Sequence, residues 1–254
     1  MSALLRMELR RLRSRRLFRW IAALAVLGFA IGAVTAFFQS GTTPSEGWFE
    51  FREMQEILES FGGAFVMIGW LVGASAIGAE WQHRTVSSLL TWEPRRTRVL
   101  AAKVIATGTF VAGLIVFLGA VLTGSLTPVA AARGTFAGVD SAWWADYAVV
   151  GGRVTLVAVM AAVLGFALAA IGKNTAAALG VGFGYFAIAE PLVRAFKPRW
   201  SEWLIGENLG LVVTGSGGFD GLGHSVAVGA LVLLAYAGAA FALSLWVFRR
   251  REIG

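Results

Sequence analysis

The chain has 254 residues, of which 57% are hydrophobic and 15% are charged, and its formal net charge is +7. Soluble domains average about 45–50% apolar and about 25% charged residues, so a water-soluble globule with this composition would lack polar surface. The chain contains no cysteine, which excludes disulfides, thiolate nucleophiles and thiolate zinc sites. The composition therefore predicts an integral membrane protein.

Six apolar stretches approach or exceed the length of about 20 residues that crosses a hydrocarbon core. Only the long region after Tyr147 is ambiguous, because just Gly172, Lys173 and Asn174 interrupt it. From Tyr147 to Ala189 one helix would extend about 64 Å, roughly twice the core thickness, so the chain must turn back once. We predict a single transmembrane domain, residues 20–254, with spans at residues 20–38, 61–79, 104–126, 147–172, 175–193 and 225–248.

The basic residues predict the orientation of these spans. With six spans, the N-terminal arm, the loop between the second and third spans, Lys173 and Arg249 to Arg251 fall on one side, whereas most acidic residues fall on the other. Loops rich in lysine and arginine stay in the cytoplasm. The sequence therefore predicts an all-α fold with both termini cytoplasmic. Because the basic residues lie beside the spans, they argue against nucleic acid as a partner.

Residues 1–19 have the pattern of a helix that lies in the headgroup plane of the inner leaflet. Leu5, Leu9 and Leu12 share one helical face, with arginines between them, as in interfacial amphipathic helices. This prediction makes membrane lipids a partner of the chain. The expected inner-leaflet contacts are Arg10, Arg11, Arg13, Arg15 and Arg16.

Two predicted external segments have distinct compositions. Residues 39–60 are acidic and are expected to form a solvated helix or a helix extension. Residues 194–224 combine tryptophans with glycines, which suit an interface and turns respectively. A partly re-entrant structure is therefore expected before the last span.

Charges inside spans are costly when they face lipid, so three charged residues are candidates for a substrate path or an external gate. Arg153 lies near the external end of the fourth predicted span, and Glu190 and Arg194 are one helical turn apart in the fifth. The alternative interpretation is structural, because Glu190 and Arg194 can pair and Arg153 can extend toward the interface. Both interpretations stay open at the level of sequence.

The segment of residues 80–98, between the second and third spans, has the most specific pattern. Val86, Leu89 and Leu90 fall at i, i+3 and i+4, which predicts a short amphipathic helix that Pro94 ends. A plain interfacial loop would satisfy the same pattern, so the residues alone leave both alternatives open.

A resemblance favours the first alternative. Glu80 at the end of the second span, a short helix containing Thr85, the Pro94-Arg95 turn and Lys103 at the start of the third span resemble the permeases of the type-2 ATP-binding-cassette (ABC) transporter family. The basic arm, the six spans and the irregular segment before the last span resemble that family as well. The match is detailed only from Glu80 to Lys103.

The resemblance implies a cytoplasmic coupling helix that sits in a cleft of a separate ATP-binding subunit. It also implies two copies of that subunit and a second permease, identical or homologous, with the substrate path between the permeases. ATP and Mg would be bound by the partner, so no cofactor is expected in this chain. By analogy, the candidate contacts with the ATP-binding subunit are Glu80, Trp81, His83, Arg84, Thr85, Val86, Leu89 and Leu90.

The sequence predicts no catalytic residue and no metal site. A phosphate-binding loop needs G-x-x-x-x-G-K-[ST], and its nearest approach, Gly172-Lys173-Asn174, lacks the upstream glycine and the hydroxyl. Ser216 and His224 lie in a glycine-rich segment in which nothing visible would fix a nucleophile and a base.

We therefore expect a permease in the plasma (inner) membrane of a bacterium that exports a hydrophobic or amphipathic substrate, such as a drug, an antimicrobial peptide, a lipid or a glycan. The alternatives are a channel that ATP does not drive, a membrane assembly scaffold and, less favoured, an intramembrane enzyme.

Overall fold

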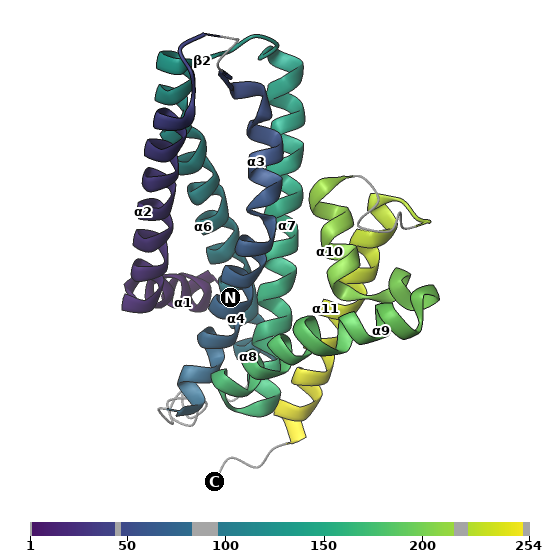
Figure 1. The fold of residues 1–254 in the computed structure, drawn as a ribbon. Helices are drawn as coiled ribbons and strands as arrows, with labels where there is room; N and C mark the ends of the chain where they lie inside the picture. Colours follow the sequence, from purple (N-terminus) through teal and green to yellow (C-terminus); the bar gives the residue numbers. More distant parts are fainter. Residues whose placement is uncertain (1, 44–46, 83–95, 216–222, 251–254) are drawn as a thin grey trace.

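The computed structural model describes residues 2–43, 47–82, 96–215 and 223–250, and it is built almost entirely of helices (Figure 1). The α-helices are α1 (Ser2–Ser14), α2 (Arg16–Gln39), α3 (Met54–Ser60), α4 (Gly62–Gln82), α6 (Arg96–Arg133), α7 (Ser141–Gly172), α8 (Thr175–Gly184), α9 (Glu190–Phe196), α10 (Ile205–Thr214) and α11 (Val226–Arg250). The shorter elements are the 3-10 helices η2 (Phe51–Glu53) and η4 (Pro198–Trp203), the π-helix η3 (Tyr185–Ala189), and the strands β1 (Phe49–Glu50) and β2 (Gly134–Thr135), which pair in parallel.

Six helical segments of the described residues are long and apolar enough to cross a membrane. They are Arg16–Gln39, Gly62–Gln82, Thr97–Arg133, Ser141–Gly172, Thr175–Phe196 and Val226–Arg250. The predicted all-α fold with six spans is thereby confirmed. The third and fourth segments are longer than the predicted spans. Helix α6 continues past its apolar centre at both ends, from Arg96 to Arg133, and α7 begins at Ser141, before the predicted start at Tyr147.

The turn predicted after Gly172 is also confirmed. Helix α7 ends there, and Lys173 adopts a left-handed conformation with φ of 54°, as is common at helix C-termini. Asn174 then caps α8, because its Oδ1 accepts a hydrogen bond of 2.8 Å from the backbone N–H of Ala176. Two residues, Lys173 and Asn174, thus separate two spans that hydropathy alone would merge.

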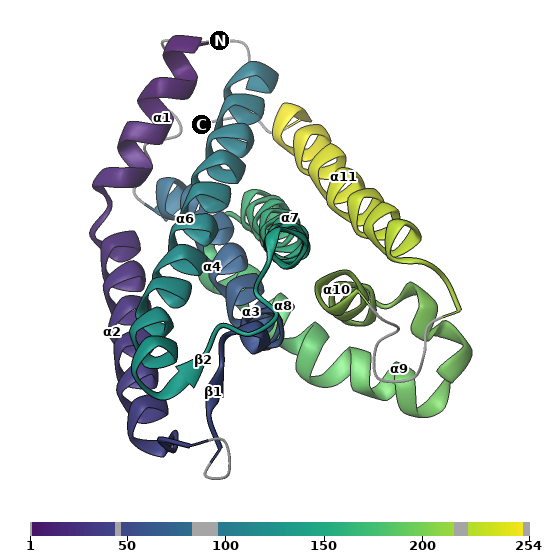
Figure 2. The same cartoon turned by 90° about the horizontal axis from the view of Figure 1, so that it is seen from above.

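Helices α4 and α7 form the centre of the bundle. About two thirds of the residues in the most apolar stretch of each helix are buried. A Cβ atom added at Gly69 or Gly73 would overlap the backbone carbonyl of Ala158 or Ala162, respectively. Small residues that allow backbones to approach this closely are typical of packed membrane helices. Seen from above, α7 lies between α6 and α11, with α4 beside it (Figure 2).

The segment before α4 extends that helix, which is one of the two structures predicted for residues 39–60. Only one side of this extension is exposed to solvent. Phe51 and Met54 are buried, whereas Glu53 and Glu56 are exposed. The Phe51 ring packs 5.6 Å from the ring of Trp143 at the start of α7. An aromatic cluster from η2 and α7 therefore packs this end of the bundle.

The fifth spanning segment is irregular near its end. Residues Tyr185–Ala189 form a π-helix that ends two residues before Pro191. Proline lacks a backbone N–H and its ring clashes with the carbonyl four residues earlier, so a wider helical turn relieves the conflict. After α9 the chain forms η4 and α10, and α10 runs beside α11 in both views (Figures 1 and 2).

Candidate functional site

The amphipathic arm forms α1, which lies across one end of the bundle, whereas α2 continues along it (Figure 1). Leu12 is buried, and Leu5 and Leu9 pack partly buried against the core. The apolar face that the leucine spacing predicts is therefore directed into the protein, mainly against α6. The arginines between the leucines stand on the remaining faces of α1, and Arg10 and Arg13 are exposed.

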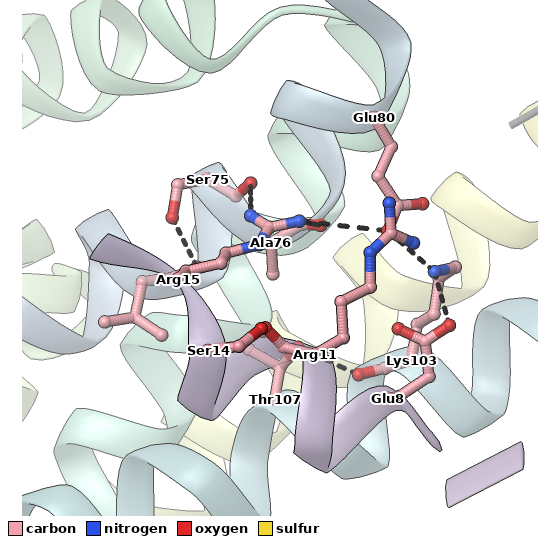
Figure 3. A network of polar contacts seen from close by, with 10 residues as sticks. Glu8, Arg11, Ser14, Arg15, Ser75, Ala76, Glu80, Lys103 and Thr107 are labelled. Carbon is pink, nitrogen blue, oxygen red and sulfur yellow. Dashed lines mark hydrogen bonds and ion pairs between the residues drawn. The ribbon is translucent and has the colours of Figure 1, made fainter. Parts of the chain in front are cut away.

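A buried ion network joins α1 to the helices on either side of residues 83–95 (Figure 3). Lys103 Nζ, in α6, lies 2.7 Å from Glu8 Oε1, in α1, and 2.8 Å from Glu80 Oε1, in α4. All three side chains are at most 8% exposed. A buried charge is tolerated when partners surround it, and here one ammonium group connects two carboxylates from different helices.

Two arginines of the arm complete this network from the more exposed side. Arg11 Nη1 lies 2.7 Å from Glu80 Oε1. Arg15 donates to the backbone carbonyls of Ser75, at 2.7 Å, and Ala76, at 3.3 Å, and its Nη2 lies 3.9 Å from Glu80 Oε1. Burial lowers the pKa of the Arg15 guanidinium, and the charge of Glu80 opposes that shift.

The two residues after Glu80 contact the opposite side of the bundle. The Trp81 ring packs edge-on against Phe248 of α11, with 6.0 Å between centroids, and Lys173 Nζ lies 5.1 Å from the Trp81 ring centre. Gln82 Nε2 donates to Asn174 Oδ1 at 3.4 Å. Three consecutive residues at the end of α4 therefore connect α1, α6, the α7–α8 turn and α11.

These contacts fix both ends of the candidate coupling segment. Glu80 precedes residues 83–95 and Lys103 follows them, and an ion pair joins the two side chains. Of the eight predicted contacts with an ATP-binding subunit, Glu80 and Trp81 are described, and both make contacts inside this chain. The other six, His83, Arg84, Thr85, Val86, Leu89 and Leu90, lie outside the described residues.

Glu190 and Arg194 lie together in a second polar cluster, at the start of α10. Glu190 is 3% exposed, and its carboxylate accepts hydrogen bonds of 3.1 Å from the backbone N–H groups of Gly206 and Glu207. Arg194 Nη2 lies 3.8 Å from Glu190 Oε1 and also pairs with the Glu207 carboxylate. The predicted pairing of Glu190 with Arg194 is present, but the contacts with α10 dominate the cluster.

Arg153 does not join that cluster. It is half-buried on α7, and a Cβ atom added at Gly215, which ends α10 with φ of 72°, would overlap the Arg153 guanidinium. Its charge also lowers the pKa of Glu59, although burial raises that pKa by more. The three candidate gate residues thus occupy two places, one at each end of α10.

An apolar cavity of about 920 Å³ lies between α2, α4 and the α8–η3 segment. Leu24, Met67, Trp70, Phe183 and Phe186 line it. The Trp70 Nε1 donates to the backbone carbonyl of Ala178 at 3.3 Å, so the indole presents an apolar face. The cavity is large enough for a drug-sized apolar molecule.

A second cavity, of about 720 Å³, opens between α6 and α7. Its wall is mainly apolar, but it contains a hydroxyl pair, because Thr123 Oγ1 and the Tyr147 hydroxyl lie 2.5 Å apart. Trp144 and Gly151 complete the same wall.

Sequence reasoning missed Glu8 and Glu207 as site residues, and it used Lys103 only as part of a motif. Glu8 had a visible signal, since it is the only acidic residue in a basic arm. Glu207 had no such signal, because acidic residues in glycine-rich segments commonly lie on the protein surface. Only the return of α10 to the bundle brings Glu207 to Arg194.

The six helices that are long and apolar enough to span a membrane define the class: a multi-pass membrane protein. Residues 4–189, more than half of the chain, match the family described as ABC-2 family transporter protein. The chain therefore belongs to the ABC-2 family of membrane permeases and is a permease subunit of an ABC transporter. An ATP-binding partner subunit generally accompanies this family. No curated protein matches the chain in a sequence comparison.

Proposed function

We propose that this chain exports a hydrophobic or amphipathic substrate, such as a drug, an antimicrobial peptide, a lipid or a glycan, with energy from ATP hydrolysis in a separate subunit. Two ATP-binding subunits and two permeases, identical or homologous, form the complex. ATP and Mg bind to the partner, and this chain contributes no catalytic group. Both termini face the cytoplasm of a bacterium, and the spans lie in its plasma (inner) membrane.

The observation that carries the proposal is the ion pair between Glu80 and Lys103. It ties together the two helices that enter and leave residues 83–95, with a separation of 2.8 Å. A loop that only crosses the interface does not need buried charges at both ends, which are costly to desolvate. A loop that receives force from a partner does need its two ends to move as one body.

The same contacts give a path for the displacement. When the ATP-binding subunits close on nucleotide, residues 83–95 would move with their cleft and pull on the end of α4. Gly69 and Gly73 hold α4 against the backbone of α7, so the two central helices would reorient together. Rigid elements that shift as units are a common form of conformational switching.

The apolar cavity beside α2 supports the substrate class. Its described wall is almost entirely apolar, which suits an apolar moiety far better than an ion. The first and fifth spans flank it. Both are largely exposed in the single chain, because only 6% and 17% of the residues in their most apolar stretches are buried. A second permease on that face would enclose the cavity and complete a substrate path.

The cluster of Glu190, Arg194 and Glu207 supports an external gate. It joins the irregular end of the fifth span to the start of α10 through both ion pairs and backbone hydrogen bonds. Arg153 contacts the other end of α10. Release of these contacts would free α10 from the bundle when the substrate leaves.

Purification of the tagged protein from its native membrane in mild detergent tests the proposal. We expect a soluble subunit with a phosphate-binding loop to co-purify and the preparation to hydrolyse ATP. A protein that purifies alone and without ATP hydrolysis would contradict ATP-driven export and would favour the channel or scaffold.

A further inference from the structure

A pocket of about 540 Å³ lies where α1 meets α2 and the end of α4. Arg11, Arg15 and Arg16 line it together with the hydroxyl-bearing residues Ser14 and Ser75. The carboxylate of Glu80 also borders the pocket, where Arg11 and Lys103 already pair with it. The pocket therefore combines several cationic hydrogen-bond donors with two hydroxyl groups. It is separate from the two apolar cavities, which lie along the spans.

The charges around this pocket do not balance among the described residues. Arg11, Arg15 and Lys103 face the two carboxylates of Glu8 and Glu80, which leaves one positive charge in excess. Arg16 in the pocket wall adds a second. Unbalanced charge near a low-dielectric region is costly, so a bound anion would stabilise the site.

Arg15 makes the need for an anion most evident. Its side chain is 19% exposed, two of its hydrogen bonds go to neutral carbonyls, and its nearest carboxylate oxygen is 3.9 Å away. The shorter contacts of Glu80 go to Lys103 and Arg11. The Arg15 guanidinium is thus buried with only partial compensation of its charge, on the wall of an open pocket.

The place of the pocket on the bundle indicates the source of the anion. It lies at the beginning of the first spanning helix, and Trp20, one turn further along α2, is 67% exposed. Exposed tryptophans beside arginines are typical of the headgroup level of a membrane. Arginine binds phosphate oxygens in a bidentate manner, and serine hydroxyls can add further hydrogen bonds.

We propose that this pocket binds a phosphate group, presented by the headgroup of an anionic phospholipid. Arg16 and Ser14, which are exposed in the chain by itself, contact the phosphate, while Arg11 and Arg15, which also pair with Glu80, supply further positive charge. A free inorganic phosphate ion offers the same chemistry. The inference goes beyond transport and does not depend on an ATP-binding partner.

Binding of phosphatidylglycerol and phosphatidylcholine to the detergent-purified chain, measured by native mass spectrometry, tests the proposal. Arg16→Gln is compared with Arg13→Gln, because both side chains are exposed on the same arm and both variants lose one charge. Arg13 does not line this pocket. We expect Arg16→Gln to weaken phosphatidylglycerol binding about tenfold, and Arg13→Gln to change it less than twofold.

Equal losses in the two variants would mean diffuse surface attraction and would overturn the proposal, as would no loss in either or no preference for phosphatidylglycerol. Inorganic phosphate distinguishes the source: if it binds with the same dependence on Arg16 while phosphatidylglycerol does not, the pocket takes the free ion. Thermal unfolding of both variants should match the unmodified chain, since neither side chain is buried. Failure of ATP-driven transport would leave these results unchanged.

Discussion

Lys103 Nζ lies 2.8 Å from Glu80 Oε1, so a buried ion pair links the helix that follows residues 83–95 to the helix that precedes them. Glu8, in α1, contacts the same ammonium group, with 2.7 Å between Glu8 Oε1 and Lys103 Nζ. Helix α1 and the two helix ends that flank residues 83–95 are therefore joined through one set of buried charges.

Replacement of Lys103 by Met should destabilise the protein by about 3–5 kcal/mol, because two buried carboxylates lose their shared cation. Lys103→Arg keeps the charge and should recover a large part of that loss. Chemical unfolding in detergent, followed by circular dichroism, measures both variants. A Lys103→Met protein as stable as the unmodified chain would show that the network contributes nothing to the fold.

Gly73→Val should disrupt the contact between α4 and α7, because its Cβ would overlap the Ala162 carbonyl. Overpacking of this kind costs about 1–3 kcal/mol or more. Gly32→Val is the matched control, since Gly32 also belongs to a G-x-x-x-G pattern but has no atom within 4 Å of an added Cβ. Thermal unfolding of detergent-purified monomer should fall only for Gly73→Val; similar melting temperatures for the two variants would argue against close α4–α7 packing.

Glu190→Gln should cost about 1–3 kcal/mol, because the buried carboxylate accepts two backbone hydrogen bonds and faces Arg194. Glu53→Gln, on an exposed side chain, should be neutral in stability and transport. Both variants are measured by thermal unfolding and, once a substrate is known, by transport. Equal and negligible effects would mean that the Glu190 carboxylate contributes nothing to stability and is no part of a gate.

Glu59, just before the second span, predicts a dependence of stability on pH. Burial raises the pKa of its carboxyl above the ordinary value of 4.5, with the charge of Arg153 opposing and that of Glu56 adding to the shift. A carboxyl with a raised pKa in the folded state contributes stability below its unfolded pKa and loses that contribution as pH rises through its folded pKa.

Glu59→Gln should therefore gain stability relative to the unmodified chain as pH increases from 4 to 7. Thermal unfolding over that range measures the difference, with Glu53→Gln as the exposed control. A difference that does not change with pH would show that the folded protein leaves the acidity of Glu59 unperturbed.

The six spans were predictable because each depends on local composition, and the turn at Lys173 was predictable because length alone required it. The ends of the helices were not predictable, because hydropathy detects only the apolar centre of a helix. Helix α6, for example, continues beyond that centre to Arg133. The Glu190–Arg194 pair followed from helical spacing. The partners Glu8 and Glu207 did not, because their contacts join different helices, and periodicity within one helix carries no information about such pairing.

The most direct test of coupling through residues 83–95 is transport by the Leu89→Asp, Leu90→Asp double variant. Two aspartates on the apolar ridge would be disfavoured in an apolar cleft of the ATP-binding subunit. We expect normal membrane insertion, loss of transport and loss of the co-purifying ATP-binding subunit, with Glu53→Gln as the unaffected control. Normal transport by the double variant would contradict the coupling role of this segment.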